Sequence, residues 1–535
     1  MKKLATPEIM RKLDRIVIEK FGIPGLVLME NAARGTVQAM FRHFPHLLKQ
    51  RVGIFAGRGN NGGDAFAVAR YLLNRGVSCQ VYLLSERETV KGDAAVNLEI
   101  LTRMGGNIIE VLNLKALQSL KEEIAHNDLL VDGILGTGLN APVQGFFYEI
   151  ISFINSLHLP VVAIDIPSGL DASTGQVLGI CLRVRLTVTL GLPKRGLLLY
   201  PGAQYCGELV TVDISLPRAA IEMESIQDYL IEGEDFIPTL APRHPTTHKG
   251  DYGHLLVLSG SVGKTGAAAM VCQAAMRVGA GLVTLGIPES LNPIMEEKLT
   301  EVMTEPLPET SEKSLSLSAK KRITELFPRK NALALGPGLS LHPETVELVR
   351  AIVGEFDRPV VIDADGLGAL AGKMDTLGTH RRNMIFTPHP GEMARLLGVS
   401  IPDIQQNRPD VARRFSQESG LILVLKGART LVASPEGDLF INPTGNPGMA
   451  SGGMGDVLTG MIGGFLAQGF PPLEAAKLGV YLHGLTGDFV AHRKGERGML
   501  ASDLVAEAPK ILQALTYGKT QINDFFFSIR NEIYY

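Results

Sequence analysis

Gly57-Arg-Gly-Asn-Asn-Gly-Gly-Asp64 follows the apolar run at residues 52–56 and precedes a segment with helical periodicity at residues 65–74. The apolar residues of that segment share one helical face: Phe66, Ala69, Leu72 and Leu73. A β-branched run, a glycine loop and a helix are typical of a strand–turn–helix unit in an α/β fold. Because the first N–H groups of a helix are unsatisfied and its dipole is positive there, the loop predicts an anion site.

The same rhythm recurs along the chain. In the first part the sequence predicts strands at 52–56, 79–84, 129–134, 161–166, 186–190 and 209–214, after helices at 7–20 and 24–43. In the second part it predicts strands at 255–258, 282–286, 332–335, 360–362, 384–387 and 421–425, then a hairpin at 430–442. Strands that alternate with helices predict mostly parallel sheets, so we expect two α/β domains.

The length of 535 residues exceeds what one hydrophobic core usually supports. Residues 217–252 show no regular pattern and carry Pro238, Pro242, Pro245 and Gly250, so they are expected to form a linker and a loop leading into the second domain. We therefore expect domains at 1–216 and 253–517 and an appended tail at 518–535.

Composition excludes several classes of protein. A net charge of -3 gives no electrostatic reason to expect nucleic acid or an anionic membrane as a partner. The apolar runs are too short or too interrupted to span a bilayer, and Glu8, Arg11, Asp14 and Arg15 interrupt any signal peptide. The scattered cysteines predict neither a metal site nor disulfides, and we expect a cytoplasmic protein: Cys79, Cys181, Cys206 and Cys272.

The first glycine loop formally matches the dinucleotide-binding pattern GxGxxG, but Asn60 and Asn61 fill it and Asp64 enters the helix. Asp64 could equally be an ordinary helix N-cap. Two further strands end in polar residues, in Val131-Asp-Gly-Ile-Leu-Gly-Thr-Gly-Leu-Asn-Ala-Pro142 and Val162-Ala-Ile-Asp-Ile-Pro-Ser-Gly169. Ligands of open α/β sheets bind beyond the carboxyl ends of the strands. The hard oxygen atoms of Asn61, Asp132 and Ser168 suit an alkali or alkaline-earth cation rather than zinc.

These three segments, in this order, resemble the NAD(P)H-hydrate epimerase domain, a Rossmann-like three-layer α/β fold. The chain departs from the family pattern at Ala65, where the family usually has Gly. The resemblance implies a potassium ion held by Asn61, Asp132 and Ser168. It also implies contact with a hydrated nicotinamide dinucleotide by Asn60, Asn61, Gly62, Gly63, Asp64, Gly136, Thr137, Gly138, Leu139, Asn140, Ala141, Pro142 and Asp165.

The chemistry of that reaction needs one well-placed acid/base group. Hydrated NAD(P)H carries a hydroxyl on a ring carbon next to nitrogen, and the nitrogen lone pair can expel it. Interconverting the two configurations requires a group that protonates the departing oxygen and then activates the returning water. We assign this general acid/base role to Asp165.

A second glycine loop, Gly452-Gly-Met-Gly-Asp456-Val-Leu-Thr-Gly460, enters an expected helix at 456–467. Its N–H groups could form an anion hole where phosphoryl charge develops, and Asp456 could take a hydroxyl proton. The alternative is a helix N-cap after a tight turn. Another loop, Gly260-Ser-Val-Gly-Lys264-Thr265, is not expected to be a Walker A loop because Leu258 stands where that pattern needs Gly.

Several segments of the second part closely resemble the ADP- or ATP-dependent NAD(P)H-hydrate dehydratase domain, which has a ribokinase-like α/β fold. They are His248-Lys-Gly-Asp-Tyr-Gly253, Gly336-Pro-Gly338, Val361-Ile-Asp-Ala-Asp365, Thr387-Pro-His-Pro-Gly-Glu392, Lys426-Gly-Ala-Arg-Thr430 and Gly445-Asn-Pro-Gly-Met-Ala450, with the glycine loop. Met454 stands where the family often has Thr. The resemblance implies nucleotide contact, with Mg²⁺ accompanying ADP or ATP, by Lys426, Gly427, Ala428, Arg429, Thr430 and Gly455. It implies hydrate contact by Ala267, Gly338, His389 and Asp456, the last as the catalytic base.

Together the resemblances imply an enzyme that repairs hydrated NADH and NADPH by epimerising the R and S forms and dehydrating the S form. We expect a homo-oligomer that acts on small molecules. Two other classes compete. A vitamin-type kinase would phosphorylate a vitamin alcohol but does not need the first domain. A non-catalytic scaffold does not need the loop-end carboxylates Asp64, Asp132, Asp165 and Asp456.

Overall fold

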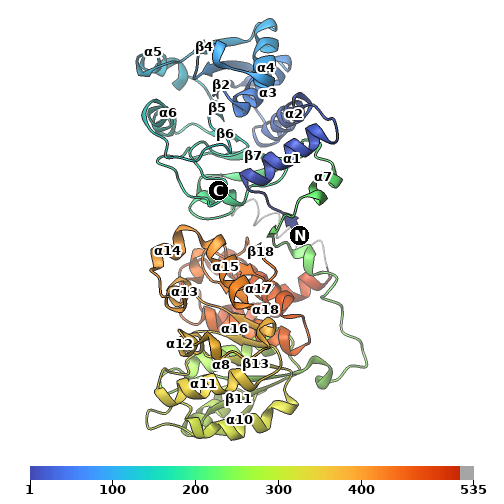
Figure 1. Ribbon diagram of the computed structural model, residues 1–535, viewed down its shortest axis with the longest axis vertical. Coiled ribbons are helices and arrows are strands. Elements are labelled where there is room, and N and C mark those ends of the chain that lie inside the picture. Colours follow the sequence, from blue (N-terminus) through green and yellow to red (C-terminus); the bar gives the residue numbers. More distant parts are fainter. Residues whose placement is uncertain (518–535) are drawn as a thin grey trace. The chain divides into compact units, whose positions relative to one another are not determined.

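The computed structural model describes residues 1–517 and divides into two compact units (Figure 1). The first unit is Lys3–Asp228, and the second is Met1–Lys2 with the chain from Tyr229 onward. The tail expected at 518–535 lies outside the described residues. Each unit is built on one mostly parallel sheet with helices against it, so the α/β class with two domains is confirmed.

The first unit contains a seven-stranded sheet in the order β4-β3-β2-β5-β6-β7-β8, and every neighbouring pair is parallel. The strands are β2 (Arg51–Ala56), β3 (Ser78–Leu83), β4 (Asn107–Glu110), β5 (Leu129–Gly133), β6 (Val161–Ile164), β7 (Leu186–Leu190) and β8 (Glu208–Val212). The central strands β2 and β5 lie side by side, so the loops that follow them meet at one edge of the sheet.

Helices cover both faces of this sheet because successive side chains of each strand point to opposite sides. Ile54 packs into one core cluster with α2, α3 and α4, while Phe55 packs into another with α5 and α6. The helices are α1 (Pro7–Glu19), α2 (Gly25–His43), α3 (Asn60–Asn74), α4 (Gly92–Arg103), α5 (Leu114–Ala125), α6 (Gly145–Ser156) and α7 (Arg218–Met223). The result is the expected three-layer α/β arrangement.

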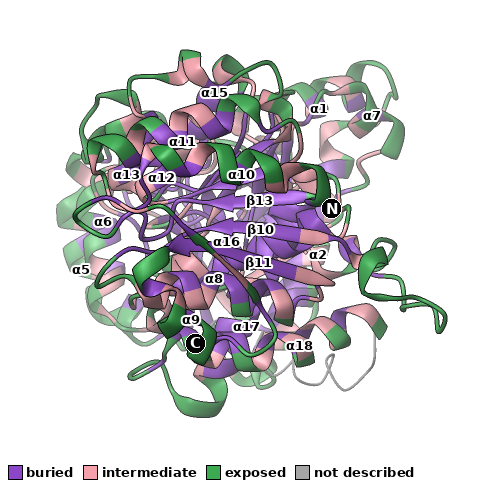
Figure 2. Cartoon of the chain, turned by 90° about the horizontal axis from the view of Figure 1, so that it is seen from below, coloured by how far each residue is buried: buried purple, intermediate pink, exposed green. Residues whose placement is uncertain are grey.

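The second unit contains an eleven-stranded sheet in the order β1-β9-β18-β17-β16-β15-β14-β13-β10-β11-β12. The strands are β1 (Lys2–Lys3), β9 (Asp228–Leu230), β10 (His254–Leu258), β11 (Leu282–Pro288), β12 (Met303–Leu307), β13 (Ala332–Leu335), β14 (Val360–Ile362), β15 (Met384–Phe386), β16 (Ile422–Leu425), β17 (Leu431–Ala433) and β18 (Leu439–Ile441). Neighbours from β16 to β12 run parallel, and the expected hairpin is the antiparallel pair β17–β18. Strands β10, β11 and β13 are almost completely buried, with helices on either side (Figure 2).

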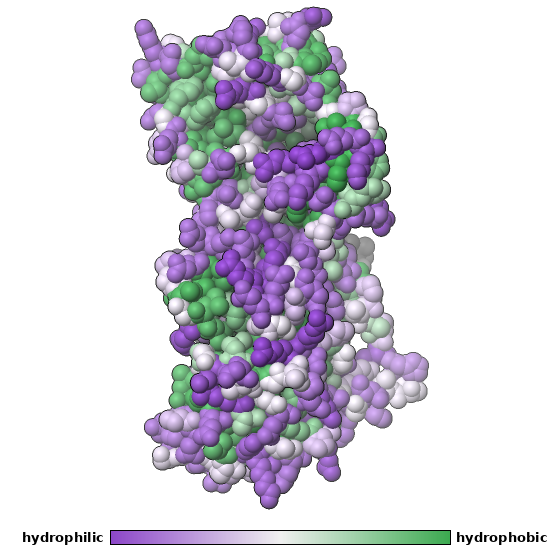
Figure 3. All heavy atoms as spheres, in the orientation of Figure 1, coloured by the Kyte–Doolittle hydropathy of each residue, from purple (hydrophilic) through white to green (hydrophobic). Residues whose placement is uncertain are grey.

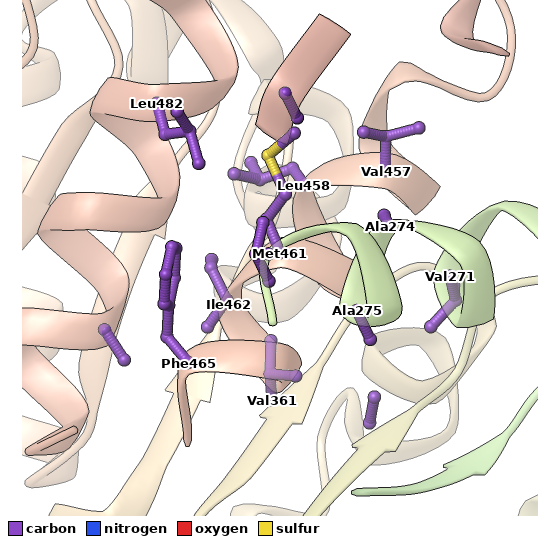
Figure 4. Packing of buried hydrophobic residues seen from close by; sticks show 14 of the residues in the cluster. Val271, Ala274, Ala275, Val361, Val457, Leu458, Met461, Ile462, Phe465 and Leu482 are labelled. Atoms are coloured by element: carbon purple, nitrogen blue, oxygen red, sulfur yellow. The ribbon is translucent and has the colours of Figure 1, made fainter. Parts of the chain in front are cut away.

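The helices of the second unit are α8 (Thr265–Arg277), α9 (Asn292–Lys298), α10 (Lys320–Leu326), α11 (Pro343–Glu355), α12 (Asp365–Leu370), α13 (Pro390–Leu397), α14 (Ile401–Gln406), α15 (Arg408–Ser419), α16 (Met454–Ala467), α17 (Pro472–Lys494) and α18 (Ala501–Tyr517). Helix α16 packs between α8 and α17 over the sheet, with Met461, Ile462 and Phe465 in the core (Figure 4). A Cβ on Gly460 would lie 2.3 Å from the carbonyl oxygen of Val271, so glycine is what allows α16 to approach α8 so closely.

Three local expectations differ from the structure. Helix α3 begins at Asn60 rather than at 65, because its first turn consists of Asn and Gly residues that read as loop. Strands β4 and β12 were not expected because they lie at the sheet edges and carry polar or proline residues. The segment 217–252 was expected to be irregular, but it contains α7, β9 and two 3-10 turns, because Ala220 and Phe236 are buried in cores.

The face drawn in Figure 3 carries many hydrophilic side chains, with apolar residues gathered in patches between them. Within residues 1–517, no helix combines the length and apolar character that a membrane crossing requires.

Candidate active sites

The first candidate site is a cavity of about 1030 Å³ in the first unit. It lies beyond the carboxyl ends of β2, β5 and β6, where the ligands of an open α/β sheet bind. Most of the residues expected to contact the dinucleotide line it: Asn60, Asn61, Asp64, Gly136, Thr137, Gly138, Leu139, Asn140, Ala141, Pro142 and Asp165. The cavity therefore brings together three segments that are far apart in the sequence.

Gly62 and Gly63 support the cavity from inside the helix. A Cβ on Gly62 would lie 1.8 Å from the carbonyl oxygen of Gly57, and one on Gly63 would lie 2.8 Å from the methyl carbon of Met29. Both glycines are buried and are absent from the lining of the cavity. They let the first turn of α3 pack tightly against the preceding loop and against α2.

The three residues expected to hold a cation lie at the sheet edge. Ser168 donates to the Asp132 carboxylate through its hydroxyl (2.6 Å) and its N–H (2.7 Å). Asn61 lies beside the same strand end, since a Cβ on Gly136 would be 3.3 Å from the Asn61 Cβ. The buried side-chain amide of Asn61 has no hydrogen-bond partner among the described residues. An unsatisfied buried oxygen is costly unless something coordinates it, so these residues fit a cation bound by oxygen atoms.

The charge on Asp132 supports the same interpretation. Burial raises the pKa of Asp132 to about 6, although hydrogen bonds from Ser168 and Ile134 act in the opposite direction. A cation at this position would favour the ionised carboxylate. Groups of three or more His, Cys, Asp or Glu side chains suited to a metal do not occur in residues 1–517, so a zinc-type site is not supported.

Asp165 follows β6 and lies in the left-handed region with φ of +68°, which is rare for a residue with a side chain. Its Oδ1 accepts hydrogen bonds from the Leu190 N–H (3.0 Å) and the Thr189 hydroxyl (3.3 Å). It also forms an ion pair with Lys194, whose side chain is only 1% exposed. These three donors hold the Asp165 carboxylate just after the carboxyl end of β6. Asp165 and Lys194 both line the cavity.

Lys194 is held in place by the segment around Leu4 and Ala5. The Ala5 N–H donates to the carbonyl of Pro193 (2.9 Å), and the Arg195 N–H donates to the carbonyl of Ala5 (3.0 Å). Leu4 and Ala5 are completely buried. The backbone on both sides of Lys194 is therefore fixed by an added strand-like segment.

Asp64 lies in the second turn of α3, and the N-cap of that helix is Gly59. The alternative interpretation of Asp64 as an N-cap is therefore wrong, because the helix begins four residues before it. The side chain is 8% exposed and lines the cavity. Burial, reinforced by the negative charge of Asp165, raises the pKa of Asp64 well above the ordinary value for a carboxyl group.

In the second unit, Lys426 lies at the centre of a charged cluster. Its ammonium contacts Asp363 at 2.6 Å and Glu392 at 3.8 Å. The Thr459 hydroxyl donates to the other oxygen of Asp363 (2.8 Å), which links the cluster to α16. Burial acts to lower the pKa of Lys426, but Asp363 and Glu392 together hold it above its ordinary value. The lysine therefore stays protonated, as a phosphate ligand must.

Asp456 lies in the first turn of α16, whose N-cap is Gly453 in the left-handed region. The N-cap interpretation of Asp456 is therefore wrong, because the helix starts at Met454. Burial, and then the charge of Asp363, raise the pKa of Asp456 to about 6, against the opposing effect of Lys426. A Cβ on Gly455 would lie 3.4 Å from Lys426 Nζ, so the glycine places the helix start directly beside the lysine.

The loop at residues 426–430, here called the lysine loop, is held by Arg408. The Arg408 guanidinium donates to four backbone carbonyls of this region, those of Leu425, Lys426, Ala428 and Arg429. The Thr430 hydroxyl closes the loop by donating to the Gly427 carbonyl (3.1 Å). Burial lowers the pKa of Arg408 to about 10. All five residues expected to bind nucleotide in this loop are thus positioned by one buried cation and one hydroxyl.

Two further expected residues, Ala267 and Gly338, lie next to each other beside Lys264. A Cβ on Gly338 would lie 3.3 Å from the Ala267 Cβ and 2.9 Å from the Lys264 Cβ. Lys264 pairs with Asp365 at 2.9 Å. The charge of Asp365 acts on Asp456, so Ala267 and Gly338 border the same charged cluster.

His389 has a structural role in addition to its expected contact with the hydrate. Its Nδ1 accepts the N–H groups of Gly391 (3.0 Å) and Glu392 (3.3 Å), which makes it the N-cap of α13. Its side chain remains 54% exposed, so Nε2 is left to face a ligand or Glu392, which lies 3.4 Å away. The Glu392 carboxylate in turn accepts a hydrogen bond from the His389 N–H.

Sequence reasoning missed several residues of these sites. Lys194, Asp14 and Ser85 line the first cavity, and Asp363 and Arg408 organise the second site. Asp363 belongs to the segment Val361-Ile-Asp-Ala-Asp365, which carries part of the resemblance, but it was given no role there although it directly follows the apolar run that forms β14. Lys194 lies in the turn after β7. The only sequence feature that could have indicated a role for it is its place at a strand end, between Pro193 and Arg195.

Comparison with known proteins finds two family models that match the chain. A family model described as NAD(P)H-hydrate dehydratase matches residues 255–510, and one described as YjeF-related protein N-terminus matches residues 25–196. The chain is 44% identical over 513 residues to the bifunctional NAD(P)H-hydrate repair enzyme Nnr of Moorella thermoacetica, covering 96% of this chain and 97% of that protein.

Two solved structures each match part of the chain. An ADP/ATP-dependent NAD(P)H-hydrate dehydratase from Bacillus subtilis, co-crystallized with ATP/Mg²⁺, is 32% identical with a TM-score of 0.47, covering 54% of this chain and 98% of that chain. A ribokinase-like superfamily protein from Enterococcus faecalis is 26% identical with a TM-score of 0.48, covering 54% of this chain and 96% of that chain.

Proposed function

The chain belongs to the family of bifunctional NAD(P)H-hydrate repair enzymes, and on that premise we propose that Asp165 carries its first reaction and Asp456 its second. The enzyme interconverts the R and S forms of hydrated NADH and NADPH, and it dehydrates the S form at the expense of ADP or ATP. It is both an isomerase and a lyase. We assign the epimerase to residues 1–216 and the dehydratase to 253–517, in keeping with the matched ranges.

In the first site, the hydrated nicotinamide ring occupies the cavity beside Asp165. The ring nitrogen expels the neighbouring hydroxyl, which takes a proton from Asp165 and leaves as water. Water then returns to the ring carbon on either face and gives a proton back to Asp165. Asp165 is suited to exchange this proton, because Lys194 and two hydrogen-bond donors hold its carboxyl group in a fixed orientation at the cavity. The loop residues 136–142 and Asn60 line the cavity and are proposed to bind the rest of the dinucleotide.

Asn61, Asp132 and Ser168 are proposed to hold K⁺. The unpartnered amide of Asn61 and the buried carboxyl of Asp132 support this assignment. A bound K⁺ supplies a fixed positive charge that helps to neutralise the diphosphate of the substrate. The protein residues themselves keep the loop after β5 in place, because Ser168 accepts the Leu135 N–H (2.8 Å) as well as donating to Asp132.

In the second site, Asp456 is proposed to accept the proton of the ring hydroxyl as phosphate is transferred to the hydroxyl oxygen of the substrate. The transfer turns a poor leaving group into a good one, and elimination then restores the nicotinamide ring. Lys426 and the N–H groups at the start of α16 are positioned to stabilise the negative charge that develops on the phosphate. Mg²⁺ is proposed to arrive with the polyphosphate, because Asp363 and Asp365 are already paired with lysines.

The observation that carries the proposal is the grouping of Lys426, Asp363 and Asp456 at the start of a glycine-rich helix. The test supplies a mixture of R and S hydrates with ATP and follows recovery of the nicotinamide absorbance. Wild-type protein should recover all of the hydrate. Asp165→Asn should stop near the S fraction, and Asp456→Asn should recover nothing while still interconverting R and S.

The alternative of a vitamin-type kinase predicts a different dependence. Nucleotide hydrolysis by this protein should require hydrated NADH or NADPH rather than a vitamin alcohol. Stimulation by a hydroxymethylpyrimidine or thiazole alcohol alone would overturn the repair function.

The cellular setting is also part of the proposal. All four cysteines are free in the structure, which supports a reducing compartment such as the cytoplasm. We also propose that the protein is a homo-oligomer, since Ile18 of α1, Phe21 between α1 and α2, and Val27 of α2 expose apolar side chains. Light scattering of the purified protein tests the oligomeric state.

A further inference from the structure

The carboxyl group of Asp64 is buried and lacks direct partners that would stabilise a negative charge. It lies in the second turn of α3, lines the first cavity and is 8% exposed. Among the described residues, no hydrogen bond or ion pair reaches its carboxyl oxygens. A buried carboxylate without partners is costly, whereas the neutral acid is not.

The charges that face Asp64 reinforce this state. Asp14 of α1 and Asp165 after β6 are both negative and both oppose ionisation of Asp64, while Lys194 favours it. Lys194, however, donates to Asp165 and to the Leu190 carbonyl (2.7 Å). The other charged side chains that line the cavity are Arg11, Arg58 and Asp93.

Asp165 has the opposite environment. Its Oδ1 accepts the Thr189 hydroxyl, the Leu190 N–H and the Lys194 ammonium. Hydrogen bonds and a cation favour the ionised form of a carboxyl group. Two carboxyl groups in one cavity thus have contrasting surroundings, since three donors reach Asp165 and none reaches Asp64 among the described residues. Such a contrast is the pattern of an acid paired with a base.

We propose that Asp64 is the catalytic acid of the first site and that Asp165 is the base. This assignment rests on the proposed epimerase function and divides between two residues a role first given to Asp165 alone. Asp64 donates its proton to the ring hydroxyl, the carbon–oxygen bond breaks, and water leaves as the nitrogen lone pair forms a carbon–nitrogen double bond.

Water then returns from the opposite face of the ring. Its oxygen bonds to the ring carbon, the electrons of the double bond go back to nitrogen, and Asp165 takes the released proton. One proton has moved from Asp64 to Asp165, and exchange with solvent in the open cavity restores both groups. In the reverse direction the two residues exchange roles, and no other reactant is consumed.

The first test is Asp64→Asn in the full chain, measured with purified R hydrate after subtraction of the rate without enzyme. The asparagine keeps the size of the side chain but cannot donate an acidic proton. Interconversion should fall about 10²–10⁴-fold. Dehydration of purified S hydrate with ATP should be unchanged, because that reaction takes place in the second unit. Binding of NADP⁺, measured by calorimetry, should stay within a few fold of wild type.

The pH dependence separates a catalytic role from a structural one. The wild-type interconversion rate should fall on the alkaline side as Asp64 loses its proton. Asp64→Asn should lose this alkaline fall. If Asp64→Asn does not bind NADP⁺, Asp64→Glu must restore both interconversion and the alkaline fall.

Two outcomes would overturn the proposal: interconversion by Asp64→Asn at the wild-type rate, or an alkaline fall that persists in that variant. Failure of Asp64→Glu, where it is needed, counts against it in the same way. Failure of the proposed function looks different, because the wild-type protein itself would then leave R and S hydrates unchanged.

Discussion

Lowering the pH below about 6 should slow dehydration of the S hydrate, because Asp456 then gains a proton and can no longer accept one from the substrate. Burial, with the charge of Asp363, raises the pKa of this carboxyl to about 6. At pH 5, one unit lower, about one tenth of the molecules retain an ionised Asp456, so kcat/KM should be about one tenth of its plateau.

Two neighbouring charges should move this acid fall in opposite directions. Lys426 lowers the pKa of Asp456, so Lys426→Met should move the fall to higher pH. Asp365 raises it, so Asp365→Asn should move the fall to lower pH. The assay follows nicotinamide absorbance with purified S hydrate between pH 5 and 8, at saturating ATP because Lys426 is also proposed to bind nucleotide.

A fall in the ordinary range of an exposed carboxyl group, unmoved by either variant, would refute the reasoning. Movement in the same direction in both variants would also refute it, because the two side chains carry opposite charges. In either case another group would be the base.

Three further changes probe the framework of the second unit. Burial lowers the pKa of Lys330 from 10.5 to about 8, so the unfolded chain binds more protons between these values and stability rises with pH there. Lys330→Met should therefore raise the unfolding free energy at pH 7 by roughly 1–3 kcal/mol, and urea titrations should find that gain lost near pH 10.5. Gly460→Ala should destabilise the protein by about 1–3 kcal/mol, because its Cβ would lie 2.3 Å from the Val271 oxygen. Gly266→Ala is the control, because its Cβ would lie 3.9 Å from the nearest neighbour, and its stability in thermal unfolding should be close to that of the wild type. Arg408→Gln should raise KM for ATP about tenfold or more with a smaller change in kcat, because it loosens the lysine loop, and equal KM values in steady-state kinetics would contradict that role.

The strands of both sheets were largely predictable because buried parallel strands are short apolar runs bounded by turns. The boundaries of β7, β13 and β14 agree with the runs at 186–190, 332–335 and 360–362. Strands β4 and β12 could not be found this way, because edge strands are half solvated and need no continuous apolar run. Helix starts were displaced where glycine and asparagine form the first turn, as in α3.

The candidate sites were predictable where backbone chemistry marks them. Asp165 and Asp456 stand in glycine-containing strand-end or helix-start motifs, and the structure places both beside charged partners. Those partners come from positions far away in sequence and carry no local pattern. Lys194, in the turn after β7, contacts Asp165 after β6. Arg408, at the start of α15, donates hydrogen bonds to the lysine loop. Only the three-dimensional fold brings such residues together.

The packing of Leu4 and Ala5 against the turn that contains Lys194 has a consequence for how this protein is produced. A fusion tag, a cloning scar or trimming that disturbs Ala5 would displace the backbone of Pro193 and Arg195, because Ala5 forms a hydrogen bond with each. Such a preparation would lose interconversion and still consume S hydrate with ATP, and would be mistaken for a monofunctional enzyme. Purification handles therefore belong away from that end.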